Sequence, residues 1–379
     1  MSQKSGRKRR VLIVQRRMTH YRVPFFNTLR DHLSSAGISL DVVFGNPTEA
    51  ETLKSDSGSL PWAHHSKCSY FFGGKLCWQP FFSQARESDL VIVTHENKML
   101  LNLFAQYGLR TRRVALWGHG ANLQGSANTI REAFKRQTAN RADWWFGYTE
   151  MSLPLILASG FPRDRVTVVE NSIDTLALAN EYAEAIRNTT STSSLDAPVG
   201  AYIGSLYQEK RIDFLLQAAE RIKLRVPDFQ MVIAGAGPEQ QKVEDFSSAN
   251  PWLSYVGTIN TREKAALLAR SRVLLNPGLV GLGILDSFVC QTPLVTTDCG
   301  LHSPEVAYLQ SGYNGMMTID NLDSFTDEVV RVVSDQEHYM QLIEGCIASS
   351  SRYTIRNMAE RFSNGIRACL DAGIRRGSR

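Results

Sequence analysis

Three glycine-containing segments in the second half of the chain carry residues suited to binding a phosphorylated ligand. The first runs from Gly204 and Ser205 to Lys210 and Arg211, directly after an apolar run typical of a strand. A glycine lets the backbone approach a ligand closely, and a cation at the start of a helix complements a diphosphate. The same residues are equally compatible with an ordinary strand-to-helix turn that carries an exposed Lys-Arg pair.

The second segment follows another strand-like run and reads Gly235-Ala236-Gly237-Pro238-Glu239. It lacks the third glycine of the dinucleotide fingerprint, and no suitable acidic residue follows about 20 positions later. An NAD-dependent oxidoreductase is therefore disfavoured. Pro238 suits the first position of a helix, so a tight turn is the simplest role for this segment.

The third segment, residues 275–293, contains glycines that interrupt a strand and open a helix. Backbone N–H groups near Gly281, Leu282 and Gly283 would attract a phosphate at the helix start. The carboxylate of Asp286, one turn further, could accept hydrogen bonds from ribose hydroxyls. The alternative is a glycine-rich connection followed by a helical aspartate with no ligand.

Charged and imidazole side chains also follow three strand-like runs in the first half. In open α/β sheets ligands bind outside the carboxyl ends of the strands, so we expect these residues at a cleft edge on the acceptor side. The arginines could meet donor phosphates or an anionic acceptor, whereas a solvated basic loop or a core histidine is the competing interpretation. The residues are Arg16, Arg17, His20 and Arg22 after the first strand, His95 and Glu96 after the third, and His119 after the fourth.

The elements that must position these residues alternate between apolar runs and helix-length amphipathic segments. Runs without polar alternation are typical of parallel strands buried on both faces. Such repetition predicts α/β, doubly wound sheets. Strands are expected at 11–14, 41–44, 90–93, 114–117, 144–148, 166–169, 201–204, 231–234, 254–256, 273–275 and 294–297, and helices at 212–225, 262–269, 325–333 and 355–374.

Length and composition favour two domains. A chain of 379 residues suggests two cores, and the Ser/Thr-rich stretch at 188–198 has the composition of a linker. We therefore expect an N-terminal Rossmann-like domain at 1–187, a C-terminal one at 199–354, and a last helix at 355–379 that can pack back on the first domain.

Charge and cysteine content narrow the class of protein. Residues 1–190 carry 24 Lys and Arg against 16 Asp and Glu, whereas residues 191–379 carry 18 against 21. A basic first half is compatible with an anionic membrane, a phosphorylated substrate or simply a solvated surface; nucleic acid is not expected as a partner. The six cysteines show no C-x-x-C spacing, so no metal site and no disulfide frame are expected. The polar N-terminus and the absence of a long apolar run predict a cytoplasmic protein.

The order of the second-half motifs resembles family 4 retaining glycosyltransferases (glycosyl transferases group 1). G-S-L-x-x-x-K is followed by A-G-x-G-P-E, V-G, the glycine-rich helix entry, T-P-L-V-T-T-D, P-E-V and N-G, over residues 199–317. The resemblance implies the GT-B fold, two Rossmann-like domains facing a central cleft, with the nucleotide-sugar donor in the C-terminal domain.

The resemblance also implies roles for single residues. Lys210 would contact the donor diphosphate, the backbone around Val256 and Ile259 would bind the base, and Asp286 would replace the second Glu of the E-x7-E motif on the ribose. Gly278 stands where the first Glu is usual, and Ser205 where many members carry Arg. The remaining donor-binding candidates are Gly204, Arg211, Gly235, Gly281, Leu282 and Gly283, and His119 corresponds to the strand-end histidine beside the transferred sugar.

These expectations define a hexosyltransferase-type enzyme that moves a sugar from a nucleotide-diphosphate donor to a glycan or polyprenyl-linked glycan, in the synthesis of cell-surface polysaccharide or lipopolysaccharide. No Asp-x-Asp is present, so no metal or other cofactor is expected. Basic segments at 110–113 and 131–141 predict peripheral contact with the inner face of the plasma membrane. The alternatives are a GT-B nucleotide-sugar epimerase or hydrolase, and a non-catalytic sugar-nucleotide-binding subunit.

Overall fold

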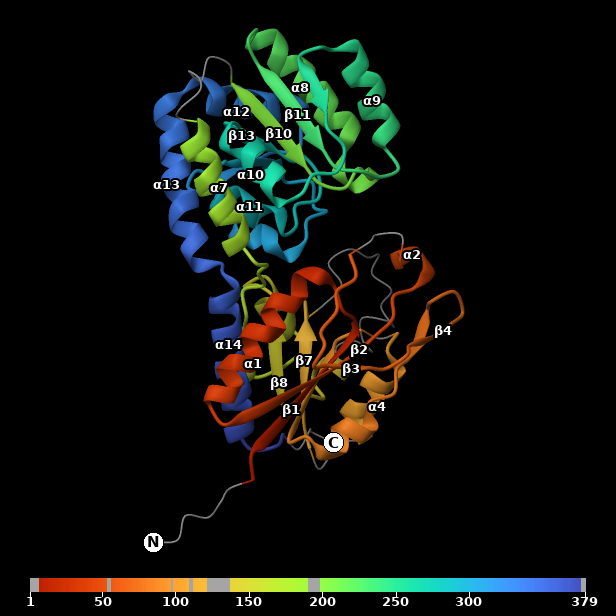
Figure 1. Ribbon diagram of the computed structural model, residues 1–379. Coiled ribbons are helices and arrows are strands. Elements are labelled where there is room, and N and C mark those ends of the chain that lie inside the picture. The colour runs from red at the N-terminus through yellow and green to blue at the C-terminus, as the bar shows by residue number, and fades with distance from the viewer. Residues whose placement is uncertain are drawn as a thin grey trace. The chain divides into compact units, whose positions relative to one another are not determined.

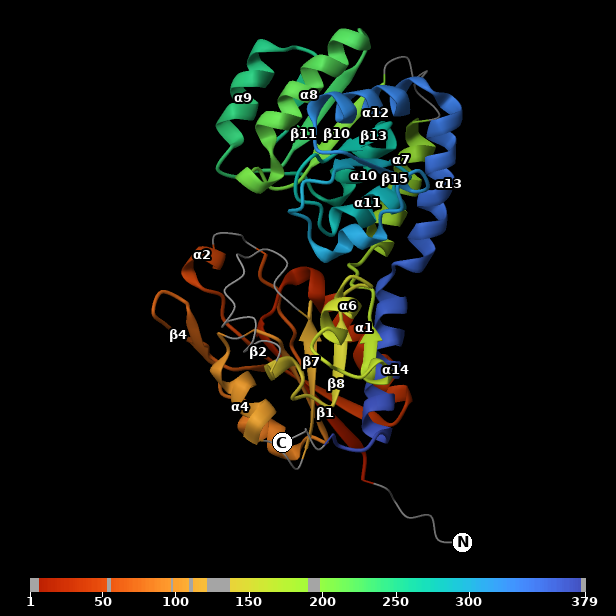
Figure 2. The same ribbon diagram turned by 180° about the vertical axis from the view of Figure 1, so that it is seen from behind.

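The computed structural model describes residues 7–52, 56–96, 98–108, 112–120, 137–189 and 198–375. The chain forms two compact units, each built on its own parallel sheet. The first unit comprises Met1–Ile173 together with Ile355–Arg379, and the second comprises Asp174–Thr354. Figures 1 and 2 show the elements of both units from opposite sides.

The sheet of the first unit has seven strands in the order β3-β2-β1-β6-β7-β8-β9, and every neighbouring pair is parallel. Side chains of β1 alternate between two cores, with Val11 and Ile13 in one and Leu12 and Val14 in the other. Burial on both faces explains why residues 11–14 of this strand form a continuous apolar run. The strands are β1 (Arg9–Arg17), β2 (Ile38–Gly45), β3 (His64–His65), β6 (Leu90–Thr94), β7 (Arg113–Gly118), β8 (Trp144–Gly147) and β9 (Val166–Val168).

Helices cover both faces of this sheet. On one face α1 (Val23–Ser35) packs against α14 (Ile355–Asp371), and on the other lie α3 (Phe82–Glu87), α4 (Leu100–Gly108) and α6 (Ser152–Leu157). Phe362 of α14 stacks on Phe146 with ring centroids 4.2 Å apart and also contacts Phe25 and Trp117. The segment after residue 355 is thus part of the first unit's core.

Smaller elements complete the first unit. A separate antiparallel hairpin is formed by β4 (Ser69–Phe71) and β5 (Leu76–Trp78), and α2 (Glu49–Thr52) follows β2.

The sheet of the second unit has six parallel strands in the order β12-β11-β10-β13-β14-β15. In chain order this is 3-2-1-4-5-6, the arrangement of doubly wound nucleotide-binding sheets. The strands are β10 (Val199–Ile203), β11 (Gln230–Ala234), β12 (Leu253–Tyr255), β13 (Val273–Leu275), β14 (Leu294–Thr297) and β15 (Gly315–Thr318).

The helices of the second unit pack in two groups. Helices α8 (Ile212–Arg225), α9 (Gln240–Ala249) and α12 (Leu322–Ser334) share one core with the strands. The helix α7 (Leu176–Thr189) packs on α10 (Thr261–Ala269) and α11 (Gly283–Val289), and α11 packs on α13 (Gln336–Arg352). The helix α13 also contacts α12 and adds Leu342 to the first core, so it belongs to both groups.

The predicted α/β, doubly wound architecture is confirmed, and each of the predicted strands is present within a few residues of its expected bounds. The division between the units differs from the expected one at residue 187. Because α7 packs on α10, it belongs to the second unit, which begins at Asp174. Of the expected linker, residues 190–197 lie outside the described residues.

Candidate functional site

Lys210 is a partly buried ammonium at the carboxyl end of the central strand of the second unit. It ends a short turn, Gln208–Lys210, between β10 and α8. Its Nζ donates a hydrogen bond to the carbonyl of Leu279, and no carboxylate pairs with it within the described residues. Burial lowers the pKa of Lys210 to about 8. A cation whose charge the fold leaves uncompensated favours an anionic ligand.

Gly204 and Gly235 bring the ends of β10 and β11 into backbone contact. A Cβ on Gly235 would lie 1.8 Å from the carbonyl oxygen of Gly204, and Gly235 has φ +142°. The N–H of Gly204 donates to Ala234 O at 3.0 Å, and that of Gly235 donates to Gly257 O at 2.7 Å. The close contact between these glycines therefore packs the ends of β10, β11 and β12 together.

Gly278 is closed off by the backbone that carries Lys210. A Cβ there would lie 2.4 Å from Glu209 O and 2.6 Å from the carbonyl carbon of Lys210. The N–H of Leu279 donates to Glu209 O at 2.9 Å, which fixes this close approach. The position at which the resemblance leads one to expect a glutamate has no room for any side chain in this backbone arrangement.

Arg211 and Ser205 differ from Lys210 in their surroundings. Arg211 adopts a left-handed backbone conformation, φ +58°, and its guanidinium pairs with Asp320 and donates to Thr297 Oγ1 at 3.2 Å. Its charge is therefore compensated inside the unit, unlike that of Lys210. Ser205 is exposed, and its carbonyl accepts a hydrogen bond from the Tyr202 hydroxyl at 2.9 Å.

Val256 and Ile259 lie on the loop after β12, where a base was expected. Val256 is 45% exposed, and Ile259 is half-buried. The loop then enters α10 through a capping box between Asn260 and Glu263, which uses the N–H of Asn260. Within the described residues the backbone of Ile259 makes no hydrogen bond, so it is available to a ligand.

Asp286 lies in the first turn of α11 and is committed to an ion pair that the sequence did not indicate. The Nζ of Lys264, on α10, donates to Asp286 Oδ2 at 2.8 Å. The Asp286 side chain is only 11% exposed. Gly281 and Leu282 are half-buried and Gly283 is exposed, at the start of the same helix. One carboxylate oxygen of Asp286 is thus held by α10 rather than directed to a ligand.

His302 was missed by the sequence analysis. It follows β14, its Nδ1 accepts the N–H of Val280 at 3.1 Å, and its Nε2 lies 2.7 Å from Thr297 O. Burial lowers its pKa, but contacts with Cys299 and Thr297 outweigh burial and the pKa is raised. Since Lys210 holds Leu279 and His302 holds Val280, the two side chains together fix this loop. In the sequence, His302 could have been found as a histidine that follows the end of a predicted strand.

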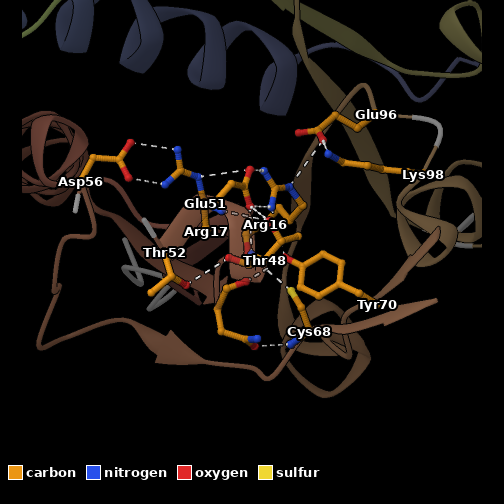
Figure 3. A network of polar contacts seen from close by, with 11 residues as sticks. Arg16, Arg17, Thr48, Glu51, Thr52, Asp56, Cys68, Tyr70, Glu96 and Lys98 are labelled. Atoms are coloured by element: carbon orange, nitrogen blue, oxygen red, sulfur yellow. Dashed lines mark hydrogen bonds and ion pairs between the residues drawn. The ribbon is translucent and has the colours of Figure 1, made fainter. Parts of the chain in front are cut away.

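In the first unit, Arg16 and Arg17 are bound by carboxylates (Figure 3). Arg16 donates to both oxygens of Glu51 at 2.7 and 2.5 Å, and Arg17 donates to both oxygens of Asp56 at 2.6 and 2.9 Å. The Arg16 hydrogen bonds hold the pKa of Glu51 far below its ordinary value. Both guanidinium charges are therefore compensated, which reduces the attraction that either could exert on a donor or acceptor anion.

Three further predicted residues of the first unit lie around this network. Glu96 pairs with Lys98 at 3.2 Å and lies 3.7 Å from Arg16 Nε. His20 is exposed, with Nδ1 3.2 Å from Asp56 O. His95 packs edge-on against a buried indole, and its Nε2 lies 3.4 Å from Thr138 Oγ1.

Arg22 and His119 lie together in a second cluster at the same edge of the sheet. Arg22 Nη1 donates to Asn171 Oδ1 at 2.7 Å, and its guanidinium carbon lies 5.1 Å from the Trp117 ring centroid. His119 packs on Tyr148 with ring centroids 4.4 Å apart. Burial, and then the charge of Arg22, lower the pKa of His119 to about 4, so the imidazole is neutral at physiological pH.

Among the described residues no group of three or more His, Cys, Asp or Glu side chains could hold a metal ion. No helix in this part of the chain has the length and apolarity needed to cross a bilayer. The basic positions Arg131, Lys135 and Arg136, predicted to contact a membrane, lie outside the described residues, as do Arg110 and Thr111.

Two parallel-sheet α/β units of this kind define the GT-B fold, and solved structures bear this out. HepE from Anabaena, in complex with UDP, matches with a TM-score of 0.68 and 13% identity, over 95% of this chain and 100% of that chain. The HepE complex with UDP-glucose matches with a TM-score of 0.66 and 14% identity, over 95% and 99% of the two chains. Sucrose-phosphate synthase from Thermosynechococcus elongatus matches with a TM-score of 0.67 and 13% identity, over 96% and 100%.

Most of the second unit is also similar in sequence to a known protein family. Residues 197–335 match the family model of glycosyl transferases group 1, a stretch that contains every donor-side residue discussed above. The predicted resemblance to glycosyl transferases group 1 is confirmed for this stretch.

Two curated relatives match over part of their length. α-Maltose-1-phosphate synthase of Mycolicibacterium smegmatis is 27% identical over 168 residues, 41% of this chain and 42% of the relative. α-D-Kanosaminyltransferase of Streptomyces kanamyceticus is 25% identical over 126 residues, 32% of this chain and 30% of the relative. The matched stretches thus span less than half of either relative.

Proposed function

We propose that the protein is a retaining glycosyltransferase that transfers a sugar from a nucleotide-diphosphate donor to a glycan or lipid-linked glycan. The GT-B fold, the match to glycosyl transferases group 1 and the names of both curated relatives support transfer of a sugar. The HepE complexes with UDP and UDP-glucose support a nucleotide-linked donor. Cell-surface polysaccharide or lipopolysaccharide synthesis is the pathway we propose.

One observation carries the proposal most directly: the uncompensated ammonium of Lys210 at the carboxyl edge of the second sheet. A diphosphate beside Lys210 would offset the cost of burying its charge and raise its pKa back toward the ordinary value. The diphosphate is also the leaving group, so the same contact stabilises the negative charge that develops during transfer.

Retention follows if the acceptor hydroxyl attacks the face from which the diphosphate departs. In that reaction the glycosidic bond forms as the sugar–phosphate bond breaks, and the acceptor proton passes to the departing phosphate. No protein nucleophile is required, and the protein contributes a cation and backbone N–H groups to the departing charge. We therefore propose that transfer needs no metal ion, with Lys210 acting where other transferases place a divalent cation.

The location of the protein is part of the same proposal. We place it in the cytoplasm, in peripheral contact with anionic lipid through its basic first unit. Changing Arg131, Lys135 and Arg136 to Glu should abolish sedimentation with phosphatidylglycerol vesicles, because each cation near such a surface contributes about 1 kcal/mol. Unchanged sedimentation would contradict the membrane contact and leave the transferase proposal intact.

The decisive test is a thermal-shift screen against UDP-, GDP-, dTDP- and CMP-sugars in the presence of EDTA. A ligand at about 100 times its Kd stabilises the folded state by about 2.7 kcal/mol, a shift that is readily measured. One nucleotide class should raise the melting temperature, and Lys210→Met should remove that shift. Arg221→Met, a charge removal on the exposed side of α8, is the matched control and should preserve it.

Turnover then separates the three candidate functions. A transferase hydrolyses the donor slowly and accelerates when the right glycan is added. A hydrolase or epimerase turns the donor over at full rate without a glycan, and a binding subunit does not turn it over at all. Either of the last two results would overturn the transferase proposal.

A further inference from the structure

Arg22 is a cation whose only partners in the described residues are neutral groups. Its guanidinium donates to the amide oxygen of Asn171 and lies over three aromatic rings, those of Tyr21, Trp117 and Tyr148, at 5.6, 5.1 and 5.6 Å. Amide and aromatic groups orient a guanidinium without cancelling its charge. The arrangement therefore presents a positioned cation that has no carboxylate partner.

Unlike Arg22, the neighbouring cations Arg16, Arg17 and Lys98 are paired with carboxylates. Arg16 is bound by Glu51, Arg17 by Asp56, and Lys98 by Glu96 (Figure 3). The carboxylate next in sequence to Asn171, that of Glu170, pairs with Arg361 of α14 at 2.8 Å. Carboxylates thus pair with the other cations named here, and none in the described part of the chain approaches Arg22.

Arg22 also lies where a ligand of this sheet would bind. It precedes α1, just after β1, while His119 follows β7, Tyr148 follows β8 and Asn171 follows β9. These four positions share the carboxyl edge of one parallel sheet, the edge at which open α/β sheets bind ligands. Neither ring nitrogen of His119 forms a hydrogen bond within the described residues, and Nδ1 is buried. The cluster therefore combines an uncompensated cation with an unsatisfied polar group.

We infer that Arg22 binds an anionic group of the acceptor, a carboxylate or a phosphate, so that this protein glycosylates a negatively charged acceptor. The inference rests on the proposed transferase function and names its acceptor class. A guanidinium binds a carboxylate or phosphate through two parallel hydrogen bonds. Arg22 donates one hydrogen bond to Asn171, and its other N–H groups make none to the residues that the structure describes.

His119 supplies a readout that does not require transfer. Burial lowers the pKa of His119, and the positive charge of Arg22 lowers it further. An anion on Arg22 would cancel the second contribution, so this pKa should rise from about 4 on binding. The chain has eight histidines, so 13C-labelled imidazoles give a small set of NMR signals, and the His119 signal is identified by its loss in His119→Gln.

The experiment titrates the full chain with methyl glucuronide, methyl glucoside and inorganic phosphate, and follows the His119 signal against pH. Methyl glucuronide or phosphate should raise the pKa of His119, and neutral methyl glucoside should not. Arg22→Gln should remove the response, whereas Arg22→Lys should retain it with affinity about tenfold weaker, since charge remains but the two-pronged geometry is lost. Arg30→Gln is the matched control: an arginine of α1 that stacks on Trp62, whose loss should change nothing.

Two results would overturn the inference. A response to methyl glucoside equal to that of the glucuronide, or one that survives in folded Arg22→Gln, means that Arg22 does not recognise an anion. A response to UDP or GDP alone that depends on Arg22 assigns the anion to the donor and removes the acceptor assignment. The donor screen with Lys210→Met is independent of both results, so failure of this inference is distinguishable from failure of the proposed function.

Discussion

Burial disfavours the charged form of Lys210, so donor binding should depend on pH. Burial places its pKa at about 8, below the ordinary value of 10.5. Above pH 8 the free protein loses the proton, and the affinity for UDP or GDP should fall by up to about tenfold per pH unit. Isothermal titration between pH 7 and 10 measures this, and Lys210→Met should give a weaker and flat profile.

Stability should move in the opposite direction over the same range. Folding lowers the pKa of Lys210, so between pH 8 and 10.5 the folded state binds fewer protons than the unfolded state. The free energy of unfolding therefore rises with pH in this range. Urea unfolding at pH 8 and pH 10 should show this increment in the wild type and not in Lys210→Met. An equal increment in both proteins would assign it to another group.

Gly278 provides a second prediction at the scale of one residue. Because a Cβ at this position meets the backbone of Glu209 and Lys210, Gly278→Ala should cost about 1–3 kcal/mol of stability and displace the Lys210 ammonium. Gly283→Ala is the steric control, since no atom lies within 4 Å of its added Cβ, and it should not lower the melting temperature. Equal melting temperatures for the two variants would contradict the close approach.

At the scale of elements, the ion pair between Lys264 and Asp286 joins α10 to α11. Removing one partner of a largely buried pair leaves the other charge uncompensated, so Asp286→Asn and Lys264→Met should each lower stability, and the double variant should lose less than the sum. A urea-unfolding double-mutant cycle measures the coupling. Additive effects would mean that the pair contributes nothing, and would return Asp286 to the ribose role first expected for it.

Sequence patterns predicted the elements better than the contacts between them. Strands buried on both faces of a parallel sheet are apolar runs, and these could be predicted from the sequence. The strands β3, β4, β5 and β15 were not predicted, because histidine, serine, cysteine or glycine interrupts their apolar pattern. The position of Lys210 at the carboxyl end of β10 could be predicted from its motif, because that position depends only on its own strand, whereas its contact with a donor stays a prediction. The partner of Arg211 lies at position 320, and that of Asp286 on another helix, so only the fold could show that both charges are already paired.

At the scale of the whole molecule, each unit has its own hydrophobic core, and we expect the two cores to unfold in separate transitions. Phe362 packs among Phe25, Trp117 and Phe146 in the first unit, so Phe362→Ala should cost about 3–5 kcal/mol there. Tryptophan fluorescence is a suitable probe, because five of the six tryptophans lie in the first unit and only Trp252 lies in the second. Val329→Ala, in the core of the second unit, should leave most of that signal in place. A single transition shifted equally by both variants would contradict independent cores.

The first unit is formed by two separate stretches of the chain, so it can be completed only after the second stretch has been synthesised. Its sheet emerges early, but α14, which covers Phe25 and Trp117, is synthesised only after the whole second unit. The second unit can therefore fold while the first still exposes an aromatic face to solvent. During translation this protein should depend on chaperones that hold apolar surface, and a released chain that ends at Thr354 should have a second unit that resists protease and a first unit that is cleaved.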